Sequence, residues 1–331
     1  MKQNMSKMTS IAMSGPRRLG LLLLAASLAS ASIPAMAMEM DDAKSKSEVY
    51  VQTNLVSDLA GVAQLQDTNL VNPWGISFSA TSPFWISDNG SGLSTLYAVT
   101  NDPSGAPKVI KQGLQVNIPG DGVPTGQLFN TTPAFNGDIF IFAGEDGTVS
   151  GWRGALGVNA ELLTSRSNAV YKGITLVTNT GSPLLLLANF REGTVDVYDS
   201  GLNLTQFSDS TAPAGYAPFN VQNLDGLVIV TFAKQNAEKH DDVSGPGNGL
   251  IDVFNPMTGN FYRLAAGSNA GGHLKEINSP WGLAVSPAGF GKHGDQLLVG
   301  NFGSGTIMAF EADGLFGNIV AVPKKMNKEN D

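Results

Sequence analysis

One polar stretch of the sequence holds most of the side chains that could do chemistry. A histidine beside carboxylates can ligate a divalent ion or form an acid–base pair. A solvated surface loop would carry the same charges, although loops are also where binding residues concentrate. Both interpretations stay open. The stretch lies between Thr231 and Gly249, and its predicted ligand-binding residues are Lys234, Glu238, His240, Asp241 and Asp242.

A second set of polar residues recurs after apolar runs along the chain. Oxygen-bearing side chains that converge on one rim could hold Ca²⁺. Asn and Asp beside glycine are also what a tight hairpin turn requires, and turn chemistry already explains each position. Ca²⁺ is therefore the alternative, and no cofactor is assigned. The residues are Asp88, Glu145, Asp146, Asn189 and Asn301.

A repeated glycine–aromatic pair indicates the elements that must position these side chains. Each glycine is followed five residues later by an aromatic residue that ends a short apolar strand. Such a period of roughly 50 residues is typical of a repeat architecture. In the fourth repeat the strand ending at Thr231 lies 18 residues before the glycine, against five or six in the other repeats, and this insertion is the polar stretch. The pairs are Gly92/Tyr97, Gly147/Trp152, Gly193/Tyr198, Gly249/Phe254 and Gly305/Phe310.

Each repeat predicts one small antiparallel sheet, which cannot bury both of its faces alone. Stacking such sheets around an axis buries them, so the pattern predicts an all-β propeller with five recognisable blades. A β-sandwich is the rival, but it does not require five copies at a constant spacing. Strands are expected over residues 49–56 and 317–322, and together they would form a reduced, composite sixth blade that closes the ring.

Composition limits the function further. Residues 1–37 read as a signal peptide, whose apolar run is too short for a membrane span. Residues 38–48 read as a disordered leader, 49–322 as the propeller domain and 323–331 as a solvated tail. Without the first 37 residues, 16 basic and 28 acidic side chains leave a charge of −12. Such a surface argues against nucleic-acid binding, and the absence of cysteine excludes thiolate chemistry.

Several motifs resemble one known family. The two Pro-Trp-Gly sequences at residues 73–75 and 280–282, with Lys239-His240-Asp241-Asp242 and Gly245-Pro246-Gly247-Asn248-Gly249, are similar to the uncharacterised, exported, NHL-like β-propeller family. The resemblance covers about residues 49–311 and implies a fold without an assigned reaction. Similar proteins have a further Trp-containing strand and hairpin before their Gly-Leu-Phe-Gly ending. Here Glu311 is followed almost directly by that ending, so we expect most of the sixth blade to be missing, and the ring either closes with five blades and a reduced sixth or is left open.

These observations lead to three hypotheses for the function. The first is an exported, monomeric binding module for a small molecule, a glycan or a protein, located in the periplasm or outside the cell. The second is a Ca²⁺-dependent hydrolase or lyase with its metal in the central channel. The third is a structural protein of a surface or matrix. Whether the protein is an enzyme stays open at this point.

Overall fold

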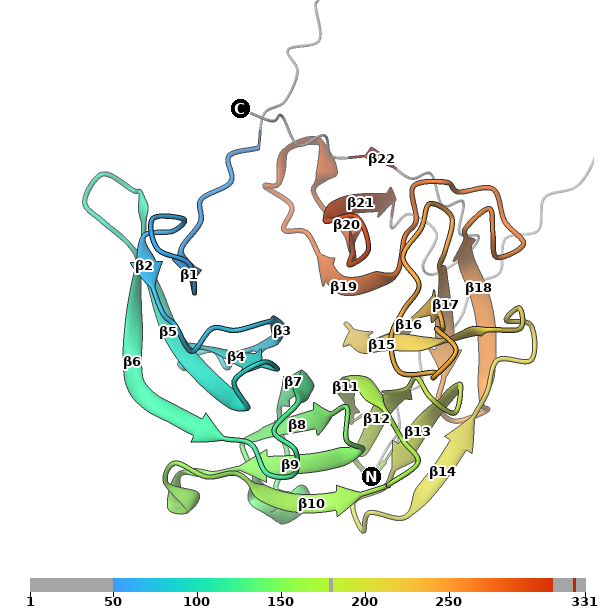
Figure 1. Cartoon of the computed structure of the whole chain (residues 1–331), viewed down its shortest axis with the longest axis horizontal. Helices are drawn as coiled ribbons and strands as arrows, with labels where there is room; N and C mark the ends of the chain where they lie inside the picture. Colours follow the sequence, from blue (N-terminus) through green and yellow to red (C-terminus); the bar gives the residue numbers. More distant parts are fainter. Residues whose placement is uncertain (1–49, 179–180, 312–323, 326–331) are drawn as a thin grey trace, which may run out of the picture. The chain divides into compact units, whose positions relative to one another are not determined.

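The computed structural model describes residues 50–178, 181–311 and 324–325. All of these residues belong to the second of the chain's two units, Glu48–Asp331. The predicted signal peptide and leader lie outside the described residues. In the second unit, four-stranded antiparallel sheets form a ring of five blades, which is a β-propeller (Figure 1). This confirms the all-β ring of blades that the repeat predicts.

Each blade is a meander whose strands follow chain order. The first blade comprises β3 Pro73–Ser77, β4 Phe84–Asp88, β5 Leu93–Asn101 and β6 Pro107–Asn117. The second comprises β7 Pro124–Phe129, β8 Phe140–Gly144, β9 Thr148–Trp152 and β10 Glu161–Ser165. The third comprises β11 Tyr171–Val177, β12 Leu184–Asn189, β13 Thr194–Tyr198 and β14 Leu204–Phe207.

The remaining blades follow the same order. The fourth comprises β15 Tyr216–Leu224, β16 Leu227–Lys234, β17 Leu250–Asn255 and β18 Asn260–Ala266. The fifth comprises β19 Pro280–Val285, β20 Gln296–Asn301, β21 Thr306–Glu311 and β22 Lys324–Lys325. Short 3₁₀ helices lie at η1 Phe135–Gly137, η2 Gly154–Leu156 and η3 Gly291–His293.

The repeated glycines lie in the turns between the second and third strands of the blades. Gly193 and Gly305 have φ values of 73° and 64°, a conformation that glycine adopts without the strain a Cβ would cause. The aromatic residue of each pair belongs to the third strand. A fourth strand then covers the outside of every blade.

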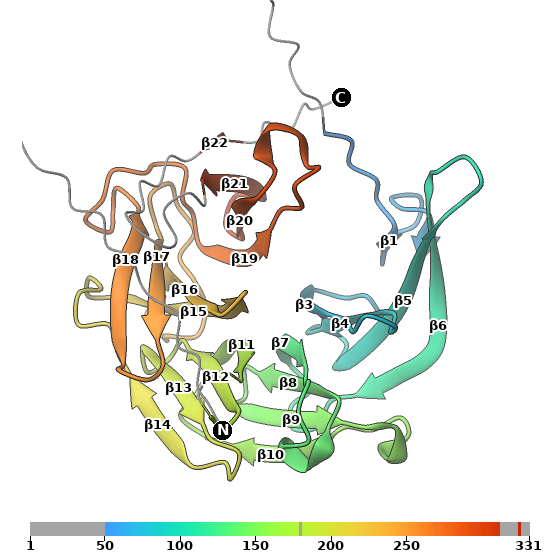
Figure 2. The same ribbon diagram turned by 180° about the vertical axis from the view of Figure 1, so that it is seen from behind.

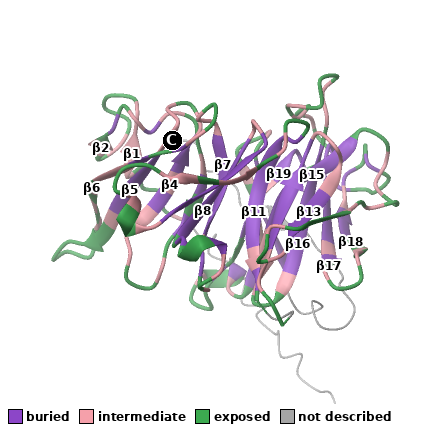
Figure 3. Ribbon diagram, turned by 90° about the horizontal axis from the view of Figure 1, so that it is seen from below, coloured by how far each residue is buried: buried purple, intermediate pink, exposed green. Residues whose placement is uncertain are grey.

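Apolar side chains of neighbouring sheets form the core. Val195 and Val197 of the third blade share one cluster with Val230 and Phe254 of the fourth. Val195 and Val197 therefore lie on the same face of β13, as every second residue of a strand does. Figure 3 shows the resulting layers of buried residues along the strands.

The first strands of the blades line the centre of the ring and approach one another closely. A Cβ at Gly126 would lie 2.7 Å from the backbone nitrogen of Ile174 in the next blade, so only glycine fits there. Side chains also connect these strands. Thr125 donates its hydroxyl to the Tyr171 carbonyl at 2.7 Å, and Asn220 donates its amide N–H to the Trp281 carbonyl at 2.6 Å.

The ends of the described chain differ from the expected composite blade. No strand is found over residues 50–55; β1 Val56–Ser57 and β2 Leu65–Gln66 instead form a separate parallel pair. The strand expected over residues 317–322 lies outside the described residues. Lys324 and Lys325, placed by the sequence in a solvated tail, pair with β21.

The first and fifth blades face each other where the described part of the chain begins, at Tyr50, and where it ends, in β22 (Figure 2). Trp74 of β3 contacts Trp281 of β19 and Phe302 with ring centroids 5.5 and 4.9 Å apart. The Tyr50 ring contacts the Phe290 ring at a centroid distance of 4.9 Å, and its hydroxyl donates to the Phe290 carbonyl. Aromatic contacts therefore connect these two blades.

Candidate functional site

The five inner strands place equivalent residues at one end of the central channel. In the first, second, third and fifth blades, each of these residues stands directly before a glycine of the inner strand; in the fourth it stands before Asn220. Three of these glycines, Gly75, Gly126 and Gly173, lie in close contact with the inner strand of the next blade, which aligns the residues before them. The equivalent residues are Trp74, Thr125, Lys172, Phe219 and Trp281. Lys172 is thus the charged member of an otherwise neutral layer.

The Lys172 ammonium is the centre of a charged group. The residue is 1% exposed, yet its Nζ forms an ion pair with Glu145 and lies 3.6 Å from the Asp241 carboxylate. Asn89 donates its amide N–H to the second Glu145 oxygen at 2.8 Å. His240 Nδ1 lies 3.0 Å from Asp241 Oδ1. We call Asn89, Glu145, Lys172, His240 and Asp241 the polar cluster.

The inserted loop of the fourth blade supplies two members of the polar cluster. Its backbone is fixed by the Asn236 side-chain oxygen, which accepts N–H groups of His240 and Asp241 at 3.0 and 3.2 Å. Gln235 donates its side-chain amide to the Phe190 carbonyl and so anchors the start of the loop on the third blade. The loop therefore reaches from the fourth blade toward Lys172 and Glu145.

The charges of the polar cluster do not cancel. Burial raises the pKa of the Asp241 carboxyl, but the hydrogen bond with His240 and the charge of Lys172 outweigh it, so this pKa lies below its usual range. Asp241 is therefore ionised at neutral pH. With Glu145 and Asp241 ionised against one ammonium, the polar cluster has an excess negative charge when His240 is neutral.

Aromatic rings border the polar cluster. Lys172 Nζ lies 5.2 Å from the centre of the Trp74 ring, a cation–π distance. Phe302, which is 48% exposed, packs against the same tryptophan. The side chains of His240 and Asp241 are 37% and 64% exposed. A ligand arriving from solvent would therefore meet an aromatic surface and two polar side chains.

The other predicted loop residues do not join the polar cluster. Asp242 accepts a hydrogen bond from Ser244 at 3.2 Å, within the loop itself. Lys234 and Glu238 are exposed. Of the five loop residues predicted from the sequence, the structure thus brings His240 and Asp241 to the centre.

Four of the five predicted Ca²⁺ residues are engaged in local hydrogen bonds. Asp88 accepts the backbone N–H of Thr95, and Asp146 accepts that of Thr148. Asn189 donates to Glu192 and Asp196, and Asn301 donates to Thr306. These bonds are the turn chemistry that the sequence offers as the alternative. Glu145 differs, because it contacts Lys172.

A metal-binding geometry exists within the polar cluster. Among the described His, Asp and Glu side chains, Glu145, His240 and Asp241 offer ligand atoms within 4.8 Å of one another. Ca²⁺, however, takes six to eight oxygen ligands. Because the Lys172 ammonium already pairs with Glu145, a metal ion at this position would compete with a resident positive charge.

Sequence reasoning missed Lys172, Asn89 and the contribution of Phe302. The sequence does contain a signal for Lys172, because it is the charged residue in the otherwise uncharged strand Tyr171–Val177. All residues of this strand except Leu176 are buried. A lysine is almost never fully buried without a partner. Aligning the inner strands on their glycines also places Lys172 level with the two tryptophans.

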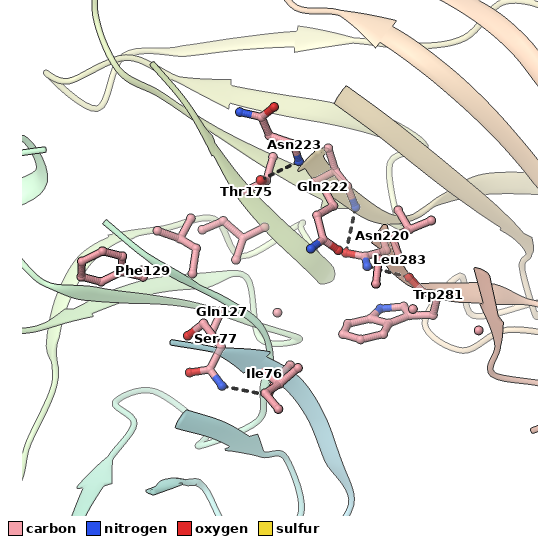
Figure 4. Close-up of a pocket in the computed structure, with 18 of the residues that line it drawn as sticks. Ile76, Ser77, Gln127, Phe129, Thr175, Asn220, Gln222, Asn223, Trp281 and Leu283 are labelled. Atoms are coloured by element: carbon pink, nitrogen blue, oxygen red, sulfur yellow. Dashed lines mark hydrogen bonds between the residues drawn. The ribbon is translucent and has the colours of Figure 1, made fainter. Parts of the chain in front are cut away.

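Beyond Trp281, the channel widens into a cavity of about 500 Å³ (Figure 4). Inner strands of all five blades line it, and Trp281 lies between it and Trp74. Its wall combines apolar side chains such as Ile174 and Leu283 with the amide side chain of Gln222. The channel thus presents two different chemical environments on the two sides of Trp281.

Comparisons with known proteins give relatives without an assigned activity. No protein-family profile matches the chain. "Uncharacterized protein L690" of Acanthamoeba polyphaga mimivirus is 26% identical over 290 residues, which cover 81% of this chain and 73% of that protein. Together with the ring of five blades, this supports a β-propeller family of unassigned function.

Solved structures resemble the chain at the level of fold. Hydrazine synthase of Kuenenia stuttgartiensis has a TM-score of 0.45 and 14% identity, with 82% of each chain covered. Virginiamycin B lyase of Staphylococcus aureus has a TM-score of 0.45 and 13% identity, with 78% of this chain and 84% of that chain covered. Because the sequence identities and TM-scores are this low, the activities in these names are not assigned to this chain. No helix among the described residues is long and apolar enough to cross a membrane.

Proposed function

We propose that this protein is an exported β-propeller that binds a small polar ligand at the polar cluster. One observation carries the proposal: charged side chains from the second, third and fourth blades meet beside Trp74 and an exposed Phe302. Burying Lys172 and most of Glu145 is costly unless they are paired and hydrogen-bonded. A solvated surface loop would not require such an arrangement beneath it.

The charge of the polar cluster indicates the preferred ligand. Asp241 and Glu145 accept hydrogen bonds, and their two negative charges exceed the single positive charge of Lys172 by one. A ligand with several donors and a positive group complements this arrangement, whereas an anion is repelled at short range. Hydrogen bonds between an ionised carboxylate and an ammonium are also stronger than neutral ones. We expect an amino sugar to bind better than a neutral sugar of the same size.

Calorimetric titration with three sugars of similar size and different charge tests this. Glucosamine should bind more tightly than glucose, and gluconate should bind least. The Asp241→Asn and His240→Ala variants should weaken glucosamine binding at least fivefold. Asp242→Asn is the matched control, since its carboxylate bonds within the loop, and it should bind like the parent protein. Absence of binding by all three sugars, or equal losses in Asp241→Asn and Asp242→Asn, contradicts the proposal.

A metal-dependent hydrolase or lyase is the second candidate, because Glu145, His240 and Asp241 lie within ligand distance of one another. It predicts that Ca²⁺ or Zn²⁺ raises the melting temperature and that a chelator lowers it again. The loss of this shift in His240→Ala would locate the ion. If neither ion changes the melting temperature, the metal-dependent candidate is wrong and the binding proposal is unaffected.

Export and a composite sixth blade complete the proposal. The charged and apolar pattern of residues 1–37 supports export, and fractionation of cells that express the full chain tests it. Exposed apolar side chains on the first and fifth blades, including Ile110 and Val285, support an additional covering element. Ile319→Pro, within the strand expected over residues 317–322, should then lower the melting temperature without removing β22, whereas an unchanged value contradicts a composite blade.

A further inference from the structure

The cavity on the far side of Trp281 has a chemistry unlike that of the polar cluster. We propose that it binds one neutral, largely apolar small molecule that carries a hydrogen-bond donor. Its volume of about 500 Å³ is within the range of pockets for drug-sized ligands. The proposal is independent of the polar cluster, because no residue of that cluster lines this cavity.

The wall of the cavity excludes a charged ligand. In the described part of the chain, none of its lining residues is Lys, Arg, His, Asp or Glu. Burying an unpaired charge in such surroundings costs far more than burying a neutral group. Ile174, Leu283 and Ile307 instead offer apolar surface, whose contact with a ligand is favourable in proportion to the area removed from water.

The side chain of Gln222 indicates a donor on the ligand. Gln127 donates its amide N–H groups to the carbonyls of Gly75 and Trp85. Its oxygen and the hydroxyl of Ser77 have no hydrogen-bond partner in the described structure, but both atoms are buried, so a ligand in the cavity does not reach them. The Gln222 side chain lines the wall and is partly exposed (Figure 4). Its amide oxygen can accept a hydrogen bond from a ligand donor without any ionic contact.

The cavity has an opening that a ligand can use. Ile76 and Ile307 line it and are 58% and 44% exposed, so this side reaches solvent between the first and fifth blades. At the other end Trp281 is held by its indole N–H, which donates to the Lys172 carbonyl at 2.9 Å. Entry and binding therefore occur on the side away from the polar cluster.

Fluorescence titration with N-phenyl-1-naphthylamine tests the proposal, because this probe is neutral, apolar and has one N–H donor. Its fluorescence should rise and saturate at one probe per protein. The anionic analogue 8-anilino-1-naphthalenesulfonate shares the ring system and should bind at least tenfold more weakly. Equal binding of the two probes contradicts a neutral site.

Three types of variant locate the bound probe. Ile76→Trp and Ile307→Trp fill the opening from exposed positions and should each abolish saturable binding, while Val99→Trp, at an exposed position outside the cavity, should not. Gln222→Leu keeps the size of the side chain, removes the amide and should weaken binding about fivefold. Circular dichroism and melting curves establish that each variant is folded. Full binding by folded Ile76→Trp and Ile307→Trp proteins overturns the assignment.

Discussion

Trp281 donates its indole N–H to the backbone carbonyl of Lys172 at 2.9 Å, which joins the fifth blade to the third across the channel. The same lysine directs its ammonium to Glu145 of the second blade and Asp241 of the fourth. One residue therefore receives a backbone contact from one blade and provides side-chain contacts to two others. The position of the polar cluster depends on this connection.

Replacing Trp281 with Phe should destabilise the protein by about 1–3 kcal/mol, because the Lys172 carbonyl loses its donor in a buried place. Urea unfolding measures the change. Trp152→Phe is the comparison, since it removes an indole bond to the Gly157 carbonyl inside one blade. Both variants should lose stability, but only Trp281→Phe should also weaken glucosamine binding. If Trp281→Phe and Trp152→Phe changed glucosamine binding equally, Trp281 would have no specific role in positioning the polar cluster.

Replacing Lys172 with Met should lower the free energy of unfolding by about 3–5 kcal/mol, because Glu145 is then largely buried without a cation. The Glu145 side chain is 11% exposed and would keep Asn89 as its donor. Adding Glu145→Gln should restore part of the loss, which urea unfolding of the single and double variants measures. Lys234→Met, at an exposed position, should change stability by less than about 0.5 kcal/mol. Additive losses in the double variant would contradict the pairing.

Asn236 should act on binding without touching the ligand. Its side-chain oxygen holds the backbone N–H groups of His240 and Asp241. We expect Asn236→Ala to increase amide hydrogen exchange in the loop and to weaken glucosamine binding, while global stability falls by about 1 kcal/mol or less. Asn236→Asp keeps an acceptor at the same place and should restore slow exchange. Unchanged exchange in Asn236→Ala would show that the loop is fixed by other contacts.

The Asp88 carboxyl should make stability depend on pH. Burial raises its pKa to about 7, although Thr95 donates a backbone N–H to it. The folded protein then binds more protons than the unfolded chain between about pH 4 and 7, so the free energy of unfolding falls as pH rises through this range. Asp88→Asn should flatten this dependence by roughly 2–4 kcal/mol. Urea unfolding at pH 5 and pH 8 measures this pH dependence, with Asp225→Asn, at an exposed position, as the control. If the free energy of unfolding changed equally with pH in the parent protein and in Asp88→Asn, the prediction would be wrong.

A buried ion pair joins the second and third blades. Arg166, which follows β10, pairs with the fully buried Asp196 of β13 and with Glu192 at 2.9 Å. Arg166→Met should cost about 3–5 kcal/mol, since Asp196 then keeps a buried charge without its cation. Arg166→Lys should recover part of this stability. Urea unfolding measures the change in the free energy of unfolding. A loss below about 1 kcal/mol in Arg166→Met would show that the hydroxyl and amide donors around Asp196 stabilise its buried charge without the arginine.

The blades could be predicted from the sequence because their signals are local. Gly193 and Gly305 take turn conformations that favour glycine, and strand alternation places Val195 and Val197 on one face. Turn chemistry likewise accounts for Asp146, whose oxygens bond to nearby backbone. The fourth strand of the third blade, Leu204–Phe207, was less visible, because it is short and mostly exposed.

The site was only partly predictable because it joins distant residues. The stretched spacing before Gly249 indicated His240 and Asp241, but the contact of Asp241 with Lys172 depends on how Asn236 folds the loop. The partnership of Lys172 with Glu145 depends on the register between blades. That register is set by close contacts of inner strands, such as Gly126 with Ile174, and no local pattern reveals it without aligning the repeats.

The aromatic join between the first and fifth blades has a mechanical consequence. In the described part of the chain, no backbone–backbone hydrogen bond connects these two blades; Trp74, Trp281 and Phe302 meet through their rings. Ring contacts slide at lower force than a ladder of strand pairs, which must break together. Pulling on the two ends of the chain should therefore separate this seam first, and the remaining blades should peel away one after another.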